Sequence, residues 1–128
     1  APALEAVLTH YGASRVVLGH TPDLNVVTPR FGGQVVIIDT GMSAYYGGHR
    51  ASLLMENGVA TARHGKTQQQ VPNRAEEVIP YFSSLAALLP ENPRLAAHLE
   101  TLQTTAAPTG SESLSATDPM GQAAESER

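Results

Sequence analysis

The first apolar positions of the chain follow a helical spacing. They are Leu4, Val7, Leu8 and Tyr11, at i, i+3, i+4 and i+7. This spacing predicts a one-sided helix, which Gly12 can end in the left-handed conformation. A short apolar and β-branched run at residues 15–18 comes next. The chain is therefore predicted to open with a helix and a buried strand.

Two further β-prone runs, residues 24–28 and 34–38, flank a stretch that contains Pro29 and ends in Gly32-Gly33. Because paired glycines can supply positive φ, the two runs are predicted to form a hairpin. Residues 35–38 are continuously apolar instead of alternating. We therefore expect the second strand to lie centrally in a sheet that is covered on both faces.

A second hairpin is predicted around Asn57-Gly58, the strongest short-range hairpin signal that a sequence can carry. Its strands are predicted at residues 50–56 and 59–64. A helix, a strand and two hairpins in this order place the first part of the chain in the α/β class.

The second half of the chain is predicted to be a polar link followed by a helical hairpin. Residues 66–70 are polar, and Asn73 with Glu76 three residues later is typical of a capping box. Pro80 is expected to kink or restart the helix that this box opens. Asn92 is the predicted N-cap of the second helix, whose apolar stripe is Leu95, Leu99 and Leu102.

These patterns divide the chain into three parts. Residues 1–66 form the α/β part, and residues 67–104 form a helical hairpin extension. Residues 105–128 hold too few large apolar groups to offset the entropy of ordering, so we expect a disordered acidic tail.

Composition and charge limit the kinds of partner and site that the chain can have. The formal charge is −4 and no basic patch is visible, which argues against binding to nucleic acid. The absence of cysteine excludes disulfides and thiolate ligands. No apolar run approaches the ~20 residues that span a bilayer. The chain has neither an initiator Met nor a basic and apolar leader, so we expect it to begin within a longer protein or behind a removed leader, and its compartment is not indicated.

His20 is the first candidate for chemistry. It follows the predicted strand 15–18 directly, with Gly19 before it and Thr21 and Pro22 after it. Ligands of α/β proteins gather at the carboxyl ends of strands, and Pro22 stiffens the loop that carries the imidazole. From spacing alone, an ordinary loop histidine is the more common case. The remaining histidines are interpreted as structural or solvated: His10, His49, His64 and His98.

The loop at residues 39–48 leaves the other strong strand and combines small residues with hydroxyl groups. Loops of this kind line sites that a rigid sheet positions. The alternative is a capped glycine turn in which Asp39 bonds nearby backbone amides. The residues alone leave both interpretations open.

Five short motifs occur in order along residues 3–65. They are Val16-Val17-Leu18-Gly19-His20-Thr21-Pro22, Arg30-Phe31-Gly32-Gly33, Ile38-Asp39-Thr40-Gly41-Met42, Tyr45-Tyr46-Gly47-Gly48 and Ala51-Ser52-Leu53-Leu54. Their order and spacing resemble the final motif region of calcineurin-like metallophosphoesterases, particularly the bacterial branch related to phosphoprotein phosphatases. By this resemblance, residues 1–66 would be the carboxy-terminal part of a metallophosphoesterase αββα sandwich.

The resemblance also implies an activity. Such domains hydrolyse phosphomonoesters, on a small molecule or a phosphoprotein, with two divalent metal ions such as Mn, Fe or Zn. His20 would correspond to the late-sequence histidine ligand of one ion. The residues lining the site would be Gly19, Thr21, Asp39, Thr40, Gly41, Tyr45 and Tyr46.

The chain lacks several segments on which the activity of the family depends. The Asp-x-His, Gly-Asp-x-x-Asp-Arg and Asn-His-Glu segments and a further His ligand, which precede Gly-His-Thr in the family, do not occur here. One imidazole cannot hold two metal ions, so we expect the chain alone to be inactive and to need the missing amino-terminal half of the domain as its partner. The alternative is a non-catalytic binding or assembly module derived from the same scaffold.

Overall fold

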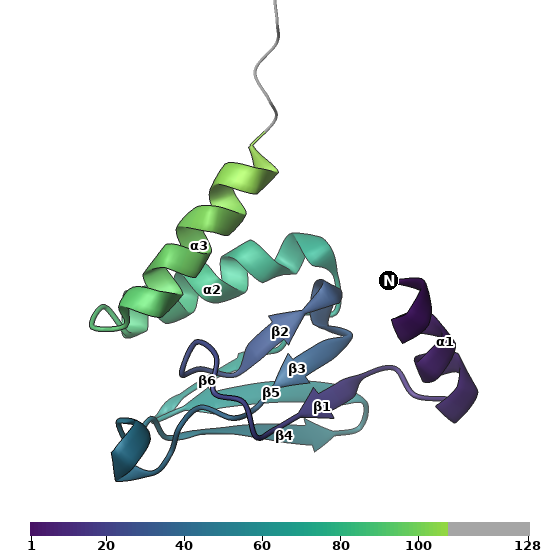
Figure 1. The fold of residues 1–128 in the computed structure, drawn as a ribbon, viewed down its shortest axis with the longest axis horizontal. Coiled ribbons are helices and arrows are strands. Elements are labelled where there is room, and N and C mark those ends of the chain that lie inside the picture. The colour runs from purple at the N-terminus through teal and green to yellow at the C-terminus, as the bar shows by residue number, and fades with distance from the viewer. Residues whose placement is uncertain (108–128) are drawn as a thin grey trace, which may run out of the picture.

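The computed structural model describes residues 1–107, and Figure 1 shows how their elements are arranged. Helix α1 (Pro2–Tyr11) lies to one side and is joined by a short connection to strand β1 (Val16–Leu18). The strands lie in the middle, and the pair α2 (Val78–Leu88) and α3 (Pro93–Ala106) lies across them. The α/β class predicted from the sequence is confirmed.

Helix α1 ends where its sequence predicts. Gly12 adopts φ 60°, and its amide donates to the carbonyl of Thr9 at 3.2 Å. This left-handed cap satisfies carbonyl groups of the last turn. Of the predicted apolar face, Leu8 is buried, whereas Val7 and Tyr11 are exposed. The rest of the described chain therefore covers only part of this helix.

The first sheet has the strand order β1-β3-β2, with β2 at Thr28–Arg30 and β3 at Val35–Ile37. Strand β1 runs parallel to β3, and β2 runs antiparallel to it. The central position predicted for residues 35–38 is confirmed, because β3 has a strand on each side and Val36 is fully buried.

Strand β1 is an edge strand, and the prediction of a buried strand at residues 15–18 is wrong. Val17 and Leu18 are 40% and 45% exposed. Within residues 1–107, β1 pairs with β3 alone. Its apolar side chains therefore have a neighbour on one side only.

The predicted hairpin between β2 and β3 is present, but its first strand begins at Thr28 instead of residue 24, and Pro29 lies inside that strand. Proline is tolerated there because β2 is an edge strand. The turn is a 3₁₀ helix, η1 (Phe31–Gly33), in which Gly33 adopts φ 90°. A Cβ atom on Gly33 would lie 1.7 Å from the carbonyl oxygen of Pro72, so only glycine fits this position.

The second sheet is an antiparallel meander of β4 (Ala51–Glu56), β5 (Val59–His64) and β6 (Thr67–Gln70). The turn predicted at Asn57-Gly58 is confirmed, with φ 49° and 77°. The prediction of a polar link at residues 66–70 is wrong, because residues 67–70 pair with β5 as a strand. Their side chains alternate between half-buried and exposed, as on a sheet with one solvated face.

The start of α2 differs in detail from the prediction. A 3₁₀ turn, η3 (Ala75–Glu77), precedes the helix, and the carboxylate of Glu77, not of Glu76, accepts from the amide of Asn73 at 2.8 Å. Pro80 lies in the first turn of α2, where a missing amide leaves no bond unmade. The helix is therefore neither kinked nor restarted at this residue.

Helix α3 begins as predicted. The Oδ1 atom of Asn92 accepts from the amide of Leu95 at 3.0 Å, which caps the helix. The helix continues to Ala106 and Ala107 is its C-cap, so the prediction of disorder is wrong for Thr105, Ala106 and Ala107. The rest of the predicted tail, residues 108–128, lies outside the described residues.

One apolar core joins both sheets to α2 and α3. Its buried members are Leu24, Val26, Val27, Val36, Ala60, Ala62, Val71, Tyr81, Phe82, Leu85 and Leu95. Leu99 and Leu102 pack against this core, which accounts for the predicted stripe on α3. The helical hairpin therefore packs on the strands of its own chain.

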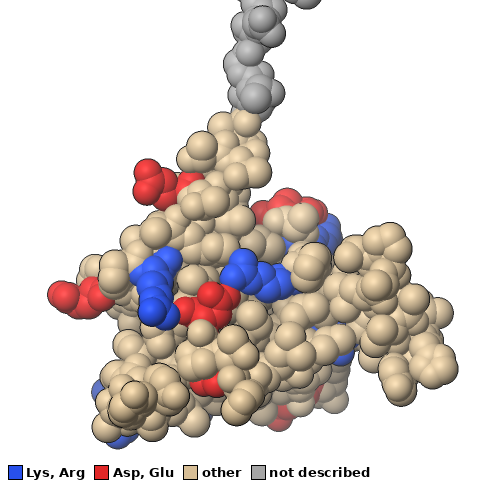
Figure 2. Space-filling model, viewed as in Figure 1, with Lys and Arg blue, Asp and Glu red and all other residues tan. Residues whose placement is uncertain are grey.

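The surface carries few charges on the face shown in Figure 2, where acidic and basic groups are interspersed among uncharged residues. Among residues 1–107, no helix has the length and apolar character needed to cross a membrane.

Candidate functional site

Parallel pairing brings together the two loops that the sequence singles out. Leu18 lies opposite Ile37, and the amide of Ile38 donates to the carbonyl of Leu18 at 2.8 Å. Because β1 and β3 run in the same direction, the segments that follow them leave the same end of the sheet. His20 and the loop at residues 39–48 therefore start side by side, at the kind of edge where α/β proteins bind ligands.

His20 has an unusual backbone conformation and an exposed side chain. Its φ is 70°, in the left-handed region that few residues other than glycine adopt. Gly19 and Thr21 are exposed as well. Among the described residues, no hydrogen bond involves the imidazole. The ring is therefore accessible to a ligand, and its predicted role in metal binding stays a prediction.

The loop at residues 39–48 is closed by its own hydrogen bonds. The carboxylate of Asp39 accepts from the amide of Gly41 at 3.2 Å, which is the capped turn considered from the sequence. The buried hydroxyl of Thr40 donates to the carbonyl of His49 at 2.7 Å, and the amide of His49 donates to the carbonyl of Gly41 at 3.1 Å. Asp39 and Thr40 therefore shape the loop.

An aromatic pair forms the exposed rim of the same loop. Tyr45 and Tyr46 lie in a 3₁₀ turn, η2 (Ala44–Tyr46), with ring centroids 4.9 Å apart in an edge-to-face arrangement. Their side chains are 88% and 56% exposed. A Cβ atom on Gly41 would lie 2.8 Å from Cβ of Tyr46, so the close approach of the rim to the loop requires glycine.

A cavity of about 340 Å³ lies between these loops and the start of α3. Its lining residues are Pro22, Asn25, Tyr46, His49, Glu91, Asn92, Pro93 and Arg94. The side-chain amide of Asn25 donates to the carbonyl of Thr40 at 3.2 Å, which fixes the two loops to each other.

Sequence reasoning missed Asn25 and His49 as members of this cavity. Asn25 adopts φ 59°, a conformation that asparagine tolerates better than most residues, and it lies shortly after the Gly-His-Thr-Pro motif. His49 directly follows the Tyr-Tyr-Gly-Gly motif. Their nearness to the two motifs is the signal that could have found them.

The described residues do not by themselves fit a two-metal centre. Within residues 1–107, no three His, Asp or Glu side chains converge on one point. His20 can supply one ligand at most, and the remaining ligands would have to come from outside the described part of the chain.

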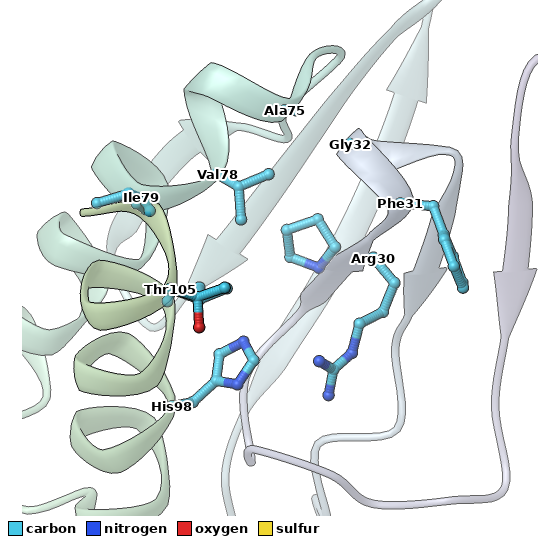
Figure 3. Close-up of a pocket in the computed structure, with 11 residues that line it drawn as sticks. Arg30, Phe31, Gly32, Ala75, Val78, Ile79, His98 and Thr105 are labelled. Atoms are coloured by element: carbon cyan, nitrogen blue, oxygen red, sulfur yellow. The ribbon is translucent and has the colours of Figure 1, made fainter. Parts of the chain in front are cut away.

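A second cavity, of about 380 Å³, lies between β2, η1 and the two long helices (Figure 3). Arg30 and His98 contribute polar groups, while Val78 and Ile79 line it with apolar surface. Arg30 forms an ion pair with Asp23, and the pKa of His98 is lowered, mainly by burial. This cavity borders η1, which precedes β3, and none of its lining residues belongs to residues 19–22 or to the loop at residues 39–48.

Comparisons with known proteins give partial similarities. No family model matches the chain. An uncharacterized protein of Schizosaccharomyces pombe is 42% identical over 40 residues, which are 31% of this chain and 12% of that protein. A cold-active protein tyrosine phosphatase of a psychrophilic Shewanella species is 24% identical, with a TM-score of 0.47, over 53% of this chain and 20% of that one.

A mutant of a cold-active protein tyrosine phosphatase is also 24% identical, with a TM-score of 0.48, over 56% of this chain and 21% of that one. The chain thus spans about a fifth or less of the proteins that it matches. These similarities assign no family.

Proposed function

We propose that this chain is the carboxy-terminal part of a calcineurin-like metallophosphoesterase domain that hydrolyses phosphomonoesters, and that it is inactive alone. The observation that carries the proposal is the parallel pairing of β1 with β3. It delivers His20 and the loop at residues 39–48 to one edge of the sheet, where the imidazole is exposed.

The open edge of β1 supports the same proposal. Val17 and Leu18 are exposed, and β1 has a single strand neighbour within residues 1–107. The remaining strands of an αββα sandwich would pair along this edge and cover those side chains. Helices α2 and α3 already cover the shared core and would form part of one outer layer.

In the proposed domain, His20 acts as a neutral imidazole ligand, with the other ligands supplied by the rest of the domain. Asp39 and Thr40 hold the neighbouring loop in shape through their bonds to Gly41 and His49. The exposed pair Tyr45 and Tyr46 would contact the organic part of the phosphomonoester at the rim.

The test uses the polypeptide of the complete reading frame. We expect it to hydrolyse p-nitrophenyl phosphate in the presence of manganese, and we expect His20→Ala to lower kcat/KM by at least about 100-fold, since a lost metal ligand costs more than a lost outer partner. The control is His10→Ala, at an exposed position of helix α1, which should leave kcat/KM unchanged.

Two results would contradict the proposal. Retained activity in His20→Ala would show that this residue is not a ligand. A complete reading frame that lacks Asp-x-His, Gly-Asp-x-x-Asp-Arg and Asn-His-Glu before Ala1 would contradict the proposed enzymatic activity.

A non-catalytic binding or assembly module is the second candidate. Both candidates expect the lack of three convergent metal ligands within residues 1–107, so the activity of the complete protein has to separate them. The second candidate predicts that the complete protein binds a partner and shows no manganese-dependent hydrolysis.

A further inference from the structure

Two arginines share the outer face of the second sheet. Ser52 lies opposite Arg63, and the amide of Gly65 donates to the carbonyl of Arg50 at 3.4 Å. Because side chains alternate along paired strands, Arg50, Ser52 and Arg63 project to one face. The opposite face carries Ala62, which is buried in the core.

These residues border a hollow of about 390 Å³. It is lined by Met42, Arg50, Ala51, Ser52, Arg63 and Gly65. Gly65 leaves room across from Arg50, since a Cβ atom there would meet nothing within 4 Å. Met42 belongs to the loop at residues 39–48, so the hollow adjoins the candidate site.

The charges of the two arginines are not balanced by carboxylates in the described part of the chain. The ion pairs there join Arg30 to Asp23, and Arg74 to Glu76 and Glu77. Like charges on neighbouring strands repel one another. An anion between them would remove this repulsion.

The side-chain amide of Gln68 lies against the guanidinium group of Arg63. With its amide oxygen turned toward Arg63, Gln68 accepts from Nε and Nη2 of that residue at 3.1 and 2.5 Å. A neutral amide fixes the direction of the guanidinium plane and leaves its positive charge in place. Such a positioned guanidinium suits a tetrahedral oxyanion, which it can bind through two parallel hydrogen bonds.

We propose that Arg50 and Arg63 form an oxyanion-binding subsite that holds a phosphate group of the substrate beside the loop at residues 39–48. This inference rests on the proposed function for the identity of the ligand. The hydroxyl of Ser52, on the same face, is a further donor to the phosphate oxygens.

The test is a titration of the 128-residue chain with inorganic phosphate at constant ionic strength, followed by amide NMR shifts. We expect saturable shifts at Arg50, Ser52, Arg63 and Gly65. Arg50→Gln and Arg63→Gln should each weaken phosphate binding about 10-fold. The matched control is Arg74→Gln, which removes an exposed arginine with acidic partners and should leave the affinity unchanged.

Each outcome is decisive. Equal phosphate affinity in Arg50→Gln, Arg63→Gln and the parent chain would overturn the subsite, and so would identical shifts on titration with chloride. The amide spectrum of each variant checks that it is folded, and if one of the two variants fails to fold, the other decides.

Failure of the subsite and failure of the proposed function are separable. In the complete enzyme, Arg50→Gln should raise KM about 10-fold for a phosphomonoester that carries a second phosphate group, and should change kcat by less than about 2-fold, because the subsite binds ground state and transition state alike. The KM for p-nitrophenyl phosphate, whose one phosphate group is the one hydrolysed, should stay unchanged. Specific phosphate binding by the 128-residue chain, together with an inactive complete protein, would support the subsite and contradict the proposed enzymatic function.

Discussion

The backbone amide of Val27 donates to Nε2 of His64 at 3.0 Å, which joins the segment before β2 to the central strand of the other sheet. Nε2 is therefore the unprotonated nitrogen, and the proton lies on Nδ1, which is buried without a hydrogen-bond partner among the described residues. The hydroxyl of Tyr81 donates to the carbonyl of Val27 at 2.8 Å. Side chains from two other elements thus satisfy both backbone groups of Val27.

This arrangement predicts a loss of stability in mild acid. Burial lowers the pKa of His64 from 6.5 to about 4. The unfolded chain takes up the proton first, so the stability contribution is complete above pH ~6.5 and is lost as the pH falls toward 4. Because the ring is partly exposed, we expect the free energy of unfolding to fall by on the order of 1–2 kcal/mol. Urea unfolding at pH ~7.5 and ~5 measures it.

The matched control is His64→Gln, which keeps an acceptor for Val27 and does not titrate. Its pH profile should be flatter than that of the parent chain. Burial also lowers the pKa of His98, so His98→Gln should remove a smaller share of the pH dependence of the free energy of unfolding. A parent profile that matches the His64→Gln profile would contradict the assignment.

Gly33→Ala should destabilise the chain by more than about 4 kcal/mol, because the new Cβ atom would collide with the carbonyl of Pro72 and the residue would have to keep a positive φ. Gly65→Ala is the comparison. It has a similar positive φ and open space around it, so it should cost only about 1 kcal/mol. Thermal unfolding of both variants measures the difference, and equal losses would show that the contact with Pro72 is not limiting.

Asn92 makes two bonds that substitutions can separate. Its Oδ1 atom caps α3 at Leu95, and its Nδ2 atom donates to the carbonyl of Leu24 at 2.8 Å. Asn92→Ala should cost about 2–3 kcal/mol in urea unfolding, since it loses both. Asn92→Ser keeps an oxygen that can cap the helix and lacks the amide that reaches Leu24, so it should cost about half as much. The same loss in both variants would mean that the cap contributes nothing.

Thr40→Val should loosen the loop at residues 39–48 with little change in side-chain volume. The hydroxyl bond to His49 is lost, which should cost about 1–2 kcal/mol. Hydrogen exchange at the amide of His49, which donates to the carbonyl of Gly41, should become faster. Thr40→Ser keeps the hydroxyl and serves as the control. Unchanged exchange in Thr40→Val would show that the loop is held by other contacts.

The sequence predicted best those features that neighbouring residues determine. Gly12, Asn57-Gly58 and Asn92 specify a helix end, a turn and a helix start through local backbone geometry, and all three are present. Strand β6 was not predicted because its Gln-rich segment has no apolar alternation. Its strand conformation is stabilised by pairing with β5, which the local sequence does not reveal.

Features that depend on distant neighbours were harder to predict. The apolar run of β1 predicts burial, but exposure is decided by whether another layer covers the strand. Likewise, the bond between Asn25 and Thr40 joins residues that follow different strands, so no local pattern contains it. The sequence predicts the two loops of the candidate site. It predicts that they lie side by side only if β1 and β3 are assumed to pair in parallel.

Pro29, in the middle of β2, makes the two edges of the first sheet unequal. Its ring nitrogen carries no hydrogen, so a strand arriving beside β2 would lack a donor at the central position. The edge at β1 has no such block. Growth of this sheet is therefore one-sided. If two copies met through their β1 edges, the combined sheet would end in a proline-bearing strand at both sides, and association would stop at a pair instead of continuing into a fibre.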